Sequence, residues 1–150
     1  MDTKIINRFQ AQCAKREYCV KEIRAKALKA LEGDAASADE LVRLLVEDRF
    51  VDDRRYASAF ARDKASLTGW GPLKIRFALR AKGVSEQDIS AALSEVDGDR
   101  ADERLDRLVQ TKMKALADDP RRRLKLLKFL LGRGYEYDAV EAAVARNADR

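Results

Sequence analysis

Histidine is absent from the 150 residues, and cysteine, proline and aromatic residues are scarce. Most catalytic triads and many metal hydrolase sites use histidine, so its absence removes the commonest routes to enzymatic chemistry. The two cysteines, Cys13 and Cys19, lack the further Cys or His ligands that a zinc site needs. We therefore expect buried or helix-capping thiols rather than a metal pair or a disulfide, and we expect no cofactor.

The sequence also lacks a long hydrophobic run. No apolar stretch approaches the ~20 residues of a membrane-spanning helix, and the first ten residues contain no signal-peptide core. We therefore expect a cytoplasmic protein with no membrane partner. Alternating β-branched residues, the pattern of a half-buried strand, are missing as well. The fold class is accordingly predicted to be all-α.

Three stretches that could suggest catalysis are better explained structurally, two as helix caps and one as a turn. The acidic pairs Asp52-Asp53 and Asp118-Asp119 consist of adjacent residues and are not spaced to share a metal. Each pair precedes a predicted helix, where a carboxylate can accept hydrogen bonds from free backbone N–H groups. Segment 69–74 has glycines before a helix but lacks the spacing of a phosphate-binding loop. The chain is therefore predicted not to be an enzyme.

The strongest positive signal is a unit of helices separated by glycine turns. In residues 50–93 one helix ends at a glycine turn, a second begins at Pro72, and Gly83 follows the second. Ser85 then opens a third helix. Trp70, beside the first turn, is expected to lie in the core rather than to form an exposed anchor.

The unit recurs towards both ends of the chain. Near the C-terminus, 51 residues later, Gly134 takes the place of Gly83, after a helix expected to start at the cap Asp119-Pro120. A looser copy at the N-terminal side has about five extra residues in its turn. Its third helix should begin with a capping box at Ser37.

Three tandem repeats of three helices are therefore predicted, at residues 1–50, 51–98 and 99–150. A chain of 150 residues could also form one ordinary domain. Because stacked repeats contact only their neighbours, the periodic pattern favours an elongated array over a globule.

Basic residues gather on the second helix of every repeat. The net charge of +5 is compatible with an acidic or nucleic-acid partner but too small to prove one. For any single residue a solvated helix face is the better explanation, yet the repeated placement favours a surface for phosphates or an acidic protein. The candidate contact residues are Arg24, Lys74, Arg76, Arg80, Arg121, Arg122, Lys125 and Lys128.

Four segments of the chain are informative together: REYCVKEI, FVDDRRYASAFARDKAS, GWGPLKIRFALRAKGVSEQDISAAL and LKFLLGRGYEYDAVEAAV. In these segments the sequence resembles the RecX family of RecA regulators. The positions that follow the family pattern most specifically are Asp52, Asp53, Tyr56, Ala57, Gly71, Leu79, Gly83 and Ile89. Cys19 departs from the pattern, which usually has serine there, and this departure affects helix capping rather than the assignment.

The resemblance implies a curved array of three-helix repeats that lies along the groove of a RecA–DNA filament. RecX-like proteins suppress ATP hydrolysis and strand exchange by RecA and favour filament loss, which would affect DNA repair, recombination and the SOS response. The candidate basic residues would then contact acidic groove surface or DNA phosphates. We expect a monomer with RecA or its filament as partner. A stand-alone nucleic-acid-binding module and a scaffold for another protein remain the alternatives.

Overall fold

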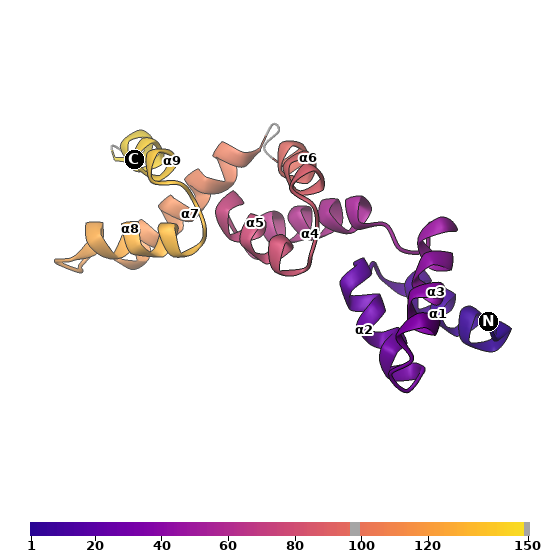
Figure 1. The fold of residues 1–150 in the computed structure, drawn as a ribbon. Helices are drawn as coiled ribbons and strands as arrows, with labels where there is room; N and C mark the ends of the chain where they lie inside the picture. Colours follow the sequence, from indigo (N-terminus) through magenta and orange to yellow (C-terminus); the bar gives the residue numbers. More distant parts are fainter. Residues whose placement is uncertain (97–99, 149–150) are drawn as a thin grey trace.

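The computed structural model describes residues 1–96 and 100–148. These residues form nine α-helices and contain no strand. Figure 1 shows an elongated, curved molecule with the chain termini at opposite ends, so the predicted all-α array is confirmed. Within the described ranges, no helix has the length and apolar character needed to cross a bilayer.

The helices follow one another in groups of three, which we call repeats 1, 2 and 3. Repeat 1 contains α1 (Thr3–Lys15), α2 (Val20–Ala30) and α3 (Ala35–Glu47); repeat 2 contains α4 (Asp53–Leu67), α5 (Pro72–Ala81) and α6 (Glu86–Val96); repeat 3 contains α7 (Ala101–Ala115), α8 (Arg122–Gly132) and α9 (Tyr137–Asn147). The exact limits of the repeats stay a prediction, and the predicted boundary between 98 and 99 lies outside the described residues.

Each repeat has its own cluster of buried apolar side chains, supplied by all three of its helices. Their fully buried side chains include Phe9, Ile23, Leu41 and Leu45 in repeat 1, Ile75, Leu79 and Ile89 in repeat 2, and Val109, Leu130 and Val140 in repeat 3. These residues recur at helical spacing in the sequence, so burial of one face of each helix explains why the segments fold as helices.

Both cysteines are buried, as predicted, but they lie in different cores. Cys13 packs into the cluster of repeat 1, whereas Cys19, which precedes α2, packs into the cluster of repeat 2. Burial raises the pKa of both thiols above the ordinary value, so both are protonated at neutral pH. The core of repeat 2 thus includes a residue supplied by repeat 1.

Two helix starts follow the predicted caps. The Asp52 carboxylate accepts a hydrogen bond from the Arg55 N–H at 3.1 Å and caps α4. The Ser85 hydroxyl accepts one from the Asp88 N–H at 3.2 Å and precedes α6. In each case a side-chain oxygen satisfies an N–H group of the first helical turn, which has no partner within the helix.

Two other predicted helix starts are wrong, the first by three residues and the second by two. The cap of α3 is Asp34 rather than Ser37, because the Asp34 carboxylate accepts the Ser37 N–H at 3.2 Å, and the helix therefore begins at Ala35. α8 begins at Arg122, whereas the sequence predicted a start at Pro120. The Asp119 carboxylate accepts an N–H there as well, but from the turn before the helix.

Repeats 2 and 3 are joined backbone to backbone at two glycines. The Gly71 N–H donates to the Arg133 carbonyl at 2.6 Å, and the Leu73 N–H donates to the Gly134 carbonyl at 2.9 Å. A Cβ atom on Gly71 would lie 2.5 Å from the carbonyl carbon of Gly134, and one on Gly134 would overlap Lys74. Gly134 also has a φ of +95°, so both positions require glycine.

Repeats 1 and 2 are joined at the equivalent place, but through side chains. Asp53 does not cap its own helix; its carboxylate accepts the Val20 N–H at the start of α2, at 2.8 Å. The Lys21 ammonium donates to the Ala81 carbonyl at 2.9 Å, and the Lys21 side chain lies beside Gly83. In both joints, therefore, the glycine turn after the second helix of one repeat lies on the first turn of the second helix of the preceding repeat.

Replacing Gly71 by alanine should loosen the joint between repeats 2 and 3. Because the methyl group overlaps the Gly134 backbone, we expect the free energy of unfolding to fall by about 1–3 kcal/mol, measured by urea denaturation. Gly132→Ala in α8 is the matched control, since nothing lies within 4 Å of its added Cβ, and it should be neutral or slightly stabilising. Equal stability of Gly71→Ala and the unsubstituted chain would contradict this account.

Asp53 should give the stability an identifiable pH dependence. Burial raises the pKa of Asp53 although the Val20 N–H favours its ionised form. The folded chain then holds this proton at pH values where the unfolded chain, with a pKa of about 3.9, has lost it. The contribution of Asp53 to stability is therefore largest at low pH and falls as pH rises through the folded pKa.

Asp53→Asn keeps a hydrogen-bond acceptor and removes the titration. We expect the stability of this variant, relative to the unsubstituted chain, to increase between about pH 4 and pH 7 in urea denaturation. A difference between the two chains that does not vary with pH would show that Asp53 has an ordinary pKa.

Candidate binding surface

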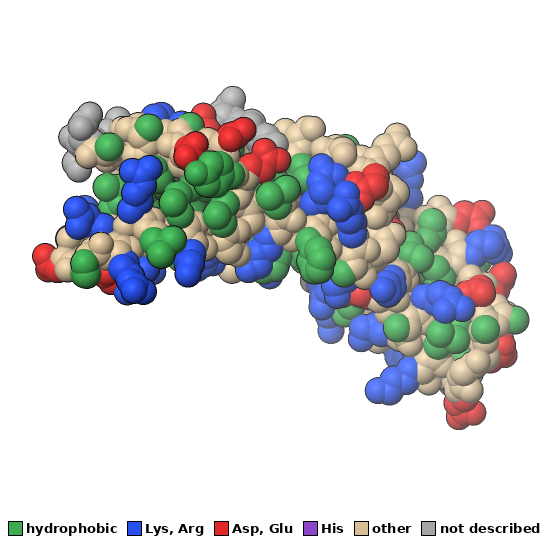
Figure 2. All heavy atoms as spheres, turned by 60° about the vertical axis from the view of Figure 1, so that its left-hand side comes forward, with side chains coloured by type: hydrophobic (Ala, Val, Ile, Leu, Met, Phe, Trp, Pro, Cys, Tyr) green, Lys and Arg blue, Asp and Glu red, His purple; other side chains and the backbone are tan. Residues whose placement is uncertain are grey.

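The second and third helices of the repeats carry opposite charges. α5 contains three basic residues and no acidic one, and α6 contains three acidic residues and no basic one. α8 likewise contains no acidic residue. Within repeats 2 and 3, Figure 1 places α5 and α8 along the lower side and α6 and α9 along the upper side. In Figure 2, many Lys and Arg side chains lie along the lower edge of these two repeats, and several Asp and Glu side chains lie towards their upper edge.

The eight candidate basic residues differ in accessibility. The exposed ones are Arg24, Arg80, Arg121, Arg122, Lys125 and Lys128. Lys74 and Arg76 are half-buried. Arg121 is the N-cap residue of α8, and Arg122, Lys125 and Lys128 lie within the helix.

Repeats 1 and 2 contain equivalent ion pairs between their second and third helices. The Arg24 guanidinium of α2 donates to the Asp39 carboxylate of α3 at 2.8 Å. Arg76 of α5 donates to Glu86 of α6 at 2.8 Å, and Arg80 binds the same carboxylate. Hydrogen bonds from Arg80 and then Arg76 hold the pKa of Glu86 below its usual range. These basic side chains are thus brought to the surface already paired with an acid of their own repeat.

Repeat 3 lacks this ion pair. The residues that stand 51 positions after Arg76, Arg80 and Glu86 are Leu127, Leu131 and Tyr137. Leu131 and Tyr137 are 41% and 53% exposed. The positive charge of repeat 3 lies instead at the start of α8, where the Lys125 ammonium contacts Asp119. The basic surface therefore has a different composition in repeat 3 from that in repeats 1 and 2.

Trp70, which was expected to lie in the core, is half-buried and packs against the core of repeat 2, where it helps to position two lysines. Its ring meets that of Phe60 edge to face, with the centroids 6.3 Å apart. The ammonium groups of Lys64 and Lys74 each lie 4.7 Å from the Trp70 ring centroid. Such cation–π contacts attract an ammonium group to the face of the ring, and both lysines are half-buried there.

The surface of α5 also carries apolar side chains that are not among the predicted site residues. Phe77 is 75% exposed and Leu73 is 46% exposed, one helical turn apart. The signal in the sequence was the position of Phe77 outside the inward stripe of Ile75 and Leu79. An exposed aromatic ring beside arginines has the composition of interface hot spots, so Phe77 joins the candidate surface.

The fold and this surface define an all-α protein of tandem three-helix repeats with a basic, partly apolar face. Among the residues that are described, no group of three potential metal ligands comes together. Family models for the second and third three-helix domains of RecX match residues 52–93 and 100–144. The chain belongs to the RecX family.

Relatives and solved structures agree with this assignment. The regulatory protein RecX of Xanthomonas axonopodis pv. citri (strain 306) is 35% identical over 141 residues, which cover 92% of this chain and 84% of the relative. That of Clostridium botulinum (strain Eklund 17B / Type B) is 36% identical over 129 residues, which cover 83% of this chain and 59% of the relative. The crystal structure of RecX from Lactobacillus salivarius has the same fold, with a TM-score of 0.86, 20% identity and coverage of 99% and 97% of the two chains.

Replacing Phe77 by alanine should leave the stability nearly unchanged, because most of the ring is already in solvent. Ile75→Ala, on the buried face of the same helix, should cost about 2–5 kcal/mol. Thermal unfolding of the two variants measures the difference. A large loss of stability for Phe77→Ala would assign the ring to the core and remove it from the candidate surface.

Proposed function

We propose that the chain binds in the groove of the RecA–DNA filament and lowers ATP hydrolysis and strand exchange by RecA, and thereby modulates DNA repair and recombination. The observation that carries this proposal is membership of the RecX family along most of the chain, since its relatives are named regulatory proteins. The candidate surface supplies the physical basis for the contact.

An elongated array with basic second helices is suited to a long partner that presents acidic groups. Arg80 and Glu86 are exposed to solvent, whereas Arg76 is half-buried. Because solvent-exposed ion pairs contribute little to stability, the arginines, and Arg80 above all, can be released from Glu86 at little cost. Their guanidinium groups can then bind a carboxylate or phosphate of the partner more strongly in a partly desolvated interface. Phe77 and Leu73 would add apolar contacts beside them.

The test of the function is ATP hydrolysis by RecA on single-stranded DNA, with this chain added well below the RecA concentration. We expect inhibition at that ratio and no effect on an unrelated DNA-dependent ATPase. Inhibition that appears only when the chain is in excess over DNA would point to competition for DNA and overturn filament-directed regulation.

The basic surface of α5 can be tested by neutralising Lys74, Arg76 and Arg80 to glutamine together. We expect the concentration for half-inhibition of RecA to rise at least tenfold, equivalent to about 1.4 kcal/mol, while thermal unfolding is unchanged. Glu86→Gln should preserve or strengthen inhibition, because it frees two arginines without removing them.

A matched control removes three exposed charges from other helices. Arg43, Arg62 and Arg107 lie on α3, α4 and α7, and their joint change to glutamine lowers the net charge equally. Inhibition should be almost unaffected in this control. If the two triple variants inhibit RecA equally, the effect is one of net charge and the α5 surface is only a solvated helix face.

A stand-alone nucleic-acid-binding module is the second candidate, favoured by the absence of acidic residues on α5 and α8. It would bind DNA without RecA, with an affinity that falls steeply as salt is added. The net charge of only +5 makes this the weaker proposal.

A further inference from the structure

Inside the array, each repeat covers a face of its neighbour. The face of repeat 2 that includes Ile75 and Leu93 is covered by repeat 3, whose Tyr135 hydroxyl donates to the Gly69 carbonyl at 3.3 Å. Only about 20 Å³ of space is left between the two repeats at this place. In this array, therefore, the side of a repeat that includes Ile75 and Leu93 is the side that receives the next repeat.

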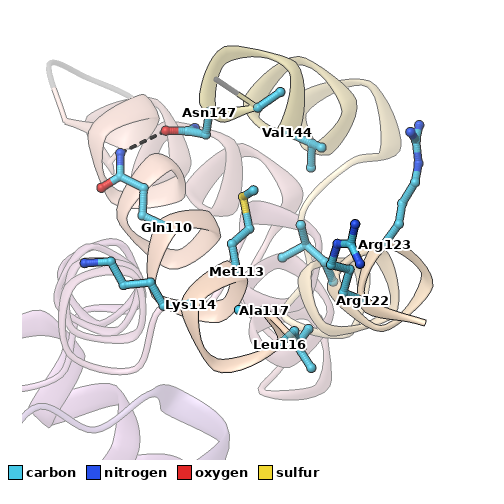
Figure 3. A pocket seen from close by; sticks show the side chains of 11 residues that line it. Gln110, Met113, Lys114, Leu116, Ala117, Arg122, Arg123, Val144 and Asn147 are labelled. Atoms are coloured by element: carbon cyan, nitrogen blue, oxygen red, sulfur yellow. Dashed lines mark hydrogen bonds between the residues drawn. The ribbon is translucent and has the colours of Figure 1, made fainter. Parts of the chain in front are cut away.

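Repeat 3 exposes the corresponding face as an open groove of about 850 Å³. Leu126 and Val144 line it and stand 51 positions after Ile75 and Leu93, the residues covered in repeat 2. Figure 3 shows the groove between α7, α8 and α9, with Met113 directed into it. Its charged lining residues are all basic: Lys114, Arg122 and Arg123.

Repeat 1 exposes a second groove, of about 600 Å³, at the opposite end of the array. Ile5 and Leu31 supply apolar lining, and the charged side chains there are the acidic Asp2 and Glu40. Glu40 pairs with Arg43 of its own helix at 2.9 Å, and the N-terminal ammonium of Met1 lies near it, so an incoming arginine competes with these groups for Glu40. The two ends of the molecule thus combine apolar surface with opposite charges. This is the complementarity that two copies of one chain need to meet end to end.

The glycine turn of repeat 1, at Gly33, is also not covered by another repeat. Gly33 follows α2 with a φ of +84°, as Gly83 and Gly134 follow their helices with φ of +76° and +95°. A Cβ on Gly83 or Gly134 would meet the preceding repeat, whereas one on Gly33 would meet nothing within 4 Å. Its neighbours in the turn, Glu32 and Asp34, are exposed and acidic.

We propose that the groove of repeat 3 receives repeat 1 of a second copy of this chain, so that copies associate head to tail. The Gly33 turn of one copy then lies at the start of α8 of the next, as the Gly83 and Gly134 turns lie on α2 and α5. Glu32 and Glu40 face Arg122 and Arg123 across this contact. The inference does not depend on the proposed action on RecA.

The structure indicates which type of joint this would be. Arg122 stands 51 positions after Gly71, so its side chain prevents the backbone-to-backbone contact seen between repeats 2 and 3. At the joint between repeats 1 and 2, Cys19 occupies the position equivalent to Gly71, and side chains form the hydrogen bonds between the repeats. The contact between copies is of this second type. Because its charged groups are exposed, the association is weak and salt-sensitive, and a dilute chain is a monomer.

Cross-linking between two variants tests the contact. One variant carries Ala36→Cys in the repeat 1 groove and the other Ala117→Cys in the repeat 3 groove, and both positions are exposed. With a short bismaleimide at low salt, the mixture should form a mixed dimer at least tenfold faster than a mixture in which either partner is replaced by Ser90→Cys on α6. The unsubstituted chain measures the background from Cys13 and Cys19, which are buried.

Charge reversal then distinguishes a specific contact from chance collisions. Arg122→Glu with Arg123→Glu, added to the Ala117→Cys chain, should reduce cross-linking to the Ser90→Cys rate. Glu32→Lys with Glu40→Lys on the Ala36→Cys chain should restore it. Circular dichroism checks that each variant is folded. Equal rates for Ala36→Cys and Ser90→Cys, or no restoration by the second reversal, would overturn the proposal.

Discussion

The close approach of a glycine turn to the start of a neighbouring helix determines how the molecule is built. Gly134 lies against the first turn of α5 through backbone hydrogen bonds, and Gly83 lies against Lys21 of α2. A three-helix repeat of about 50 residues buries little surface by itself and gains stability from its neighbours. Cys19, supplied by repeat 1 to the core of repeat 2, illustrates this sharing. The elongated shape and its curvature follow from repeating such a joint.

The joints also determine which side chains are available for binding. Lys74 belongs to the first turn of α5, where Gly134 packs, and its ammonium is held over the Trp70 ring. One helical turn further, Phe77 is free of the joint and largely exposed. The start of each second helix is therefore used for contact between repeats, and the remainder of its outer face is left for a partner. The charges on α5 are consequently positioned by the architecture, not by flexible loops.

The sequence predicts the helices and cores well because burial leaves a periodic trace. Ile75, Leu79 and Ile89 mark one face at helical spacing, and the same pattern returns 51 residues later. Contacts between helices leave no such trace. The pairing of Arg80 with Glu86 depends on the relative placement of α5 and α6. For the same reason Asp53 could be recognised as a capping residue, but not as a cap for α2.

Repeats 1 and 2 differ from repeat 3 in the charges that lie between the second and third helices. A positive-φ glycine, by contrast, follows the second helix in all three repeats, and at Gly83 and Gly134 it packs against the preceding repeat. A solvated ion pair such as Arg80–Glu86 contributes little to stability, so replacing it by Leu131 and Tyr137 costs the fold little. The exposed Tyr137 ring and Leu131 give repeat 3 an apolar surface where repeat 2 is charged. An elongated partner would therefore meet chemically different surfaces along one array. Its own surfaces could match all of them in only one direction and register.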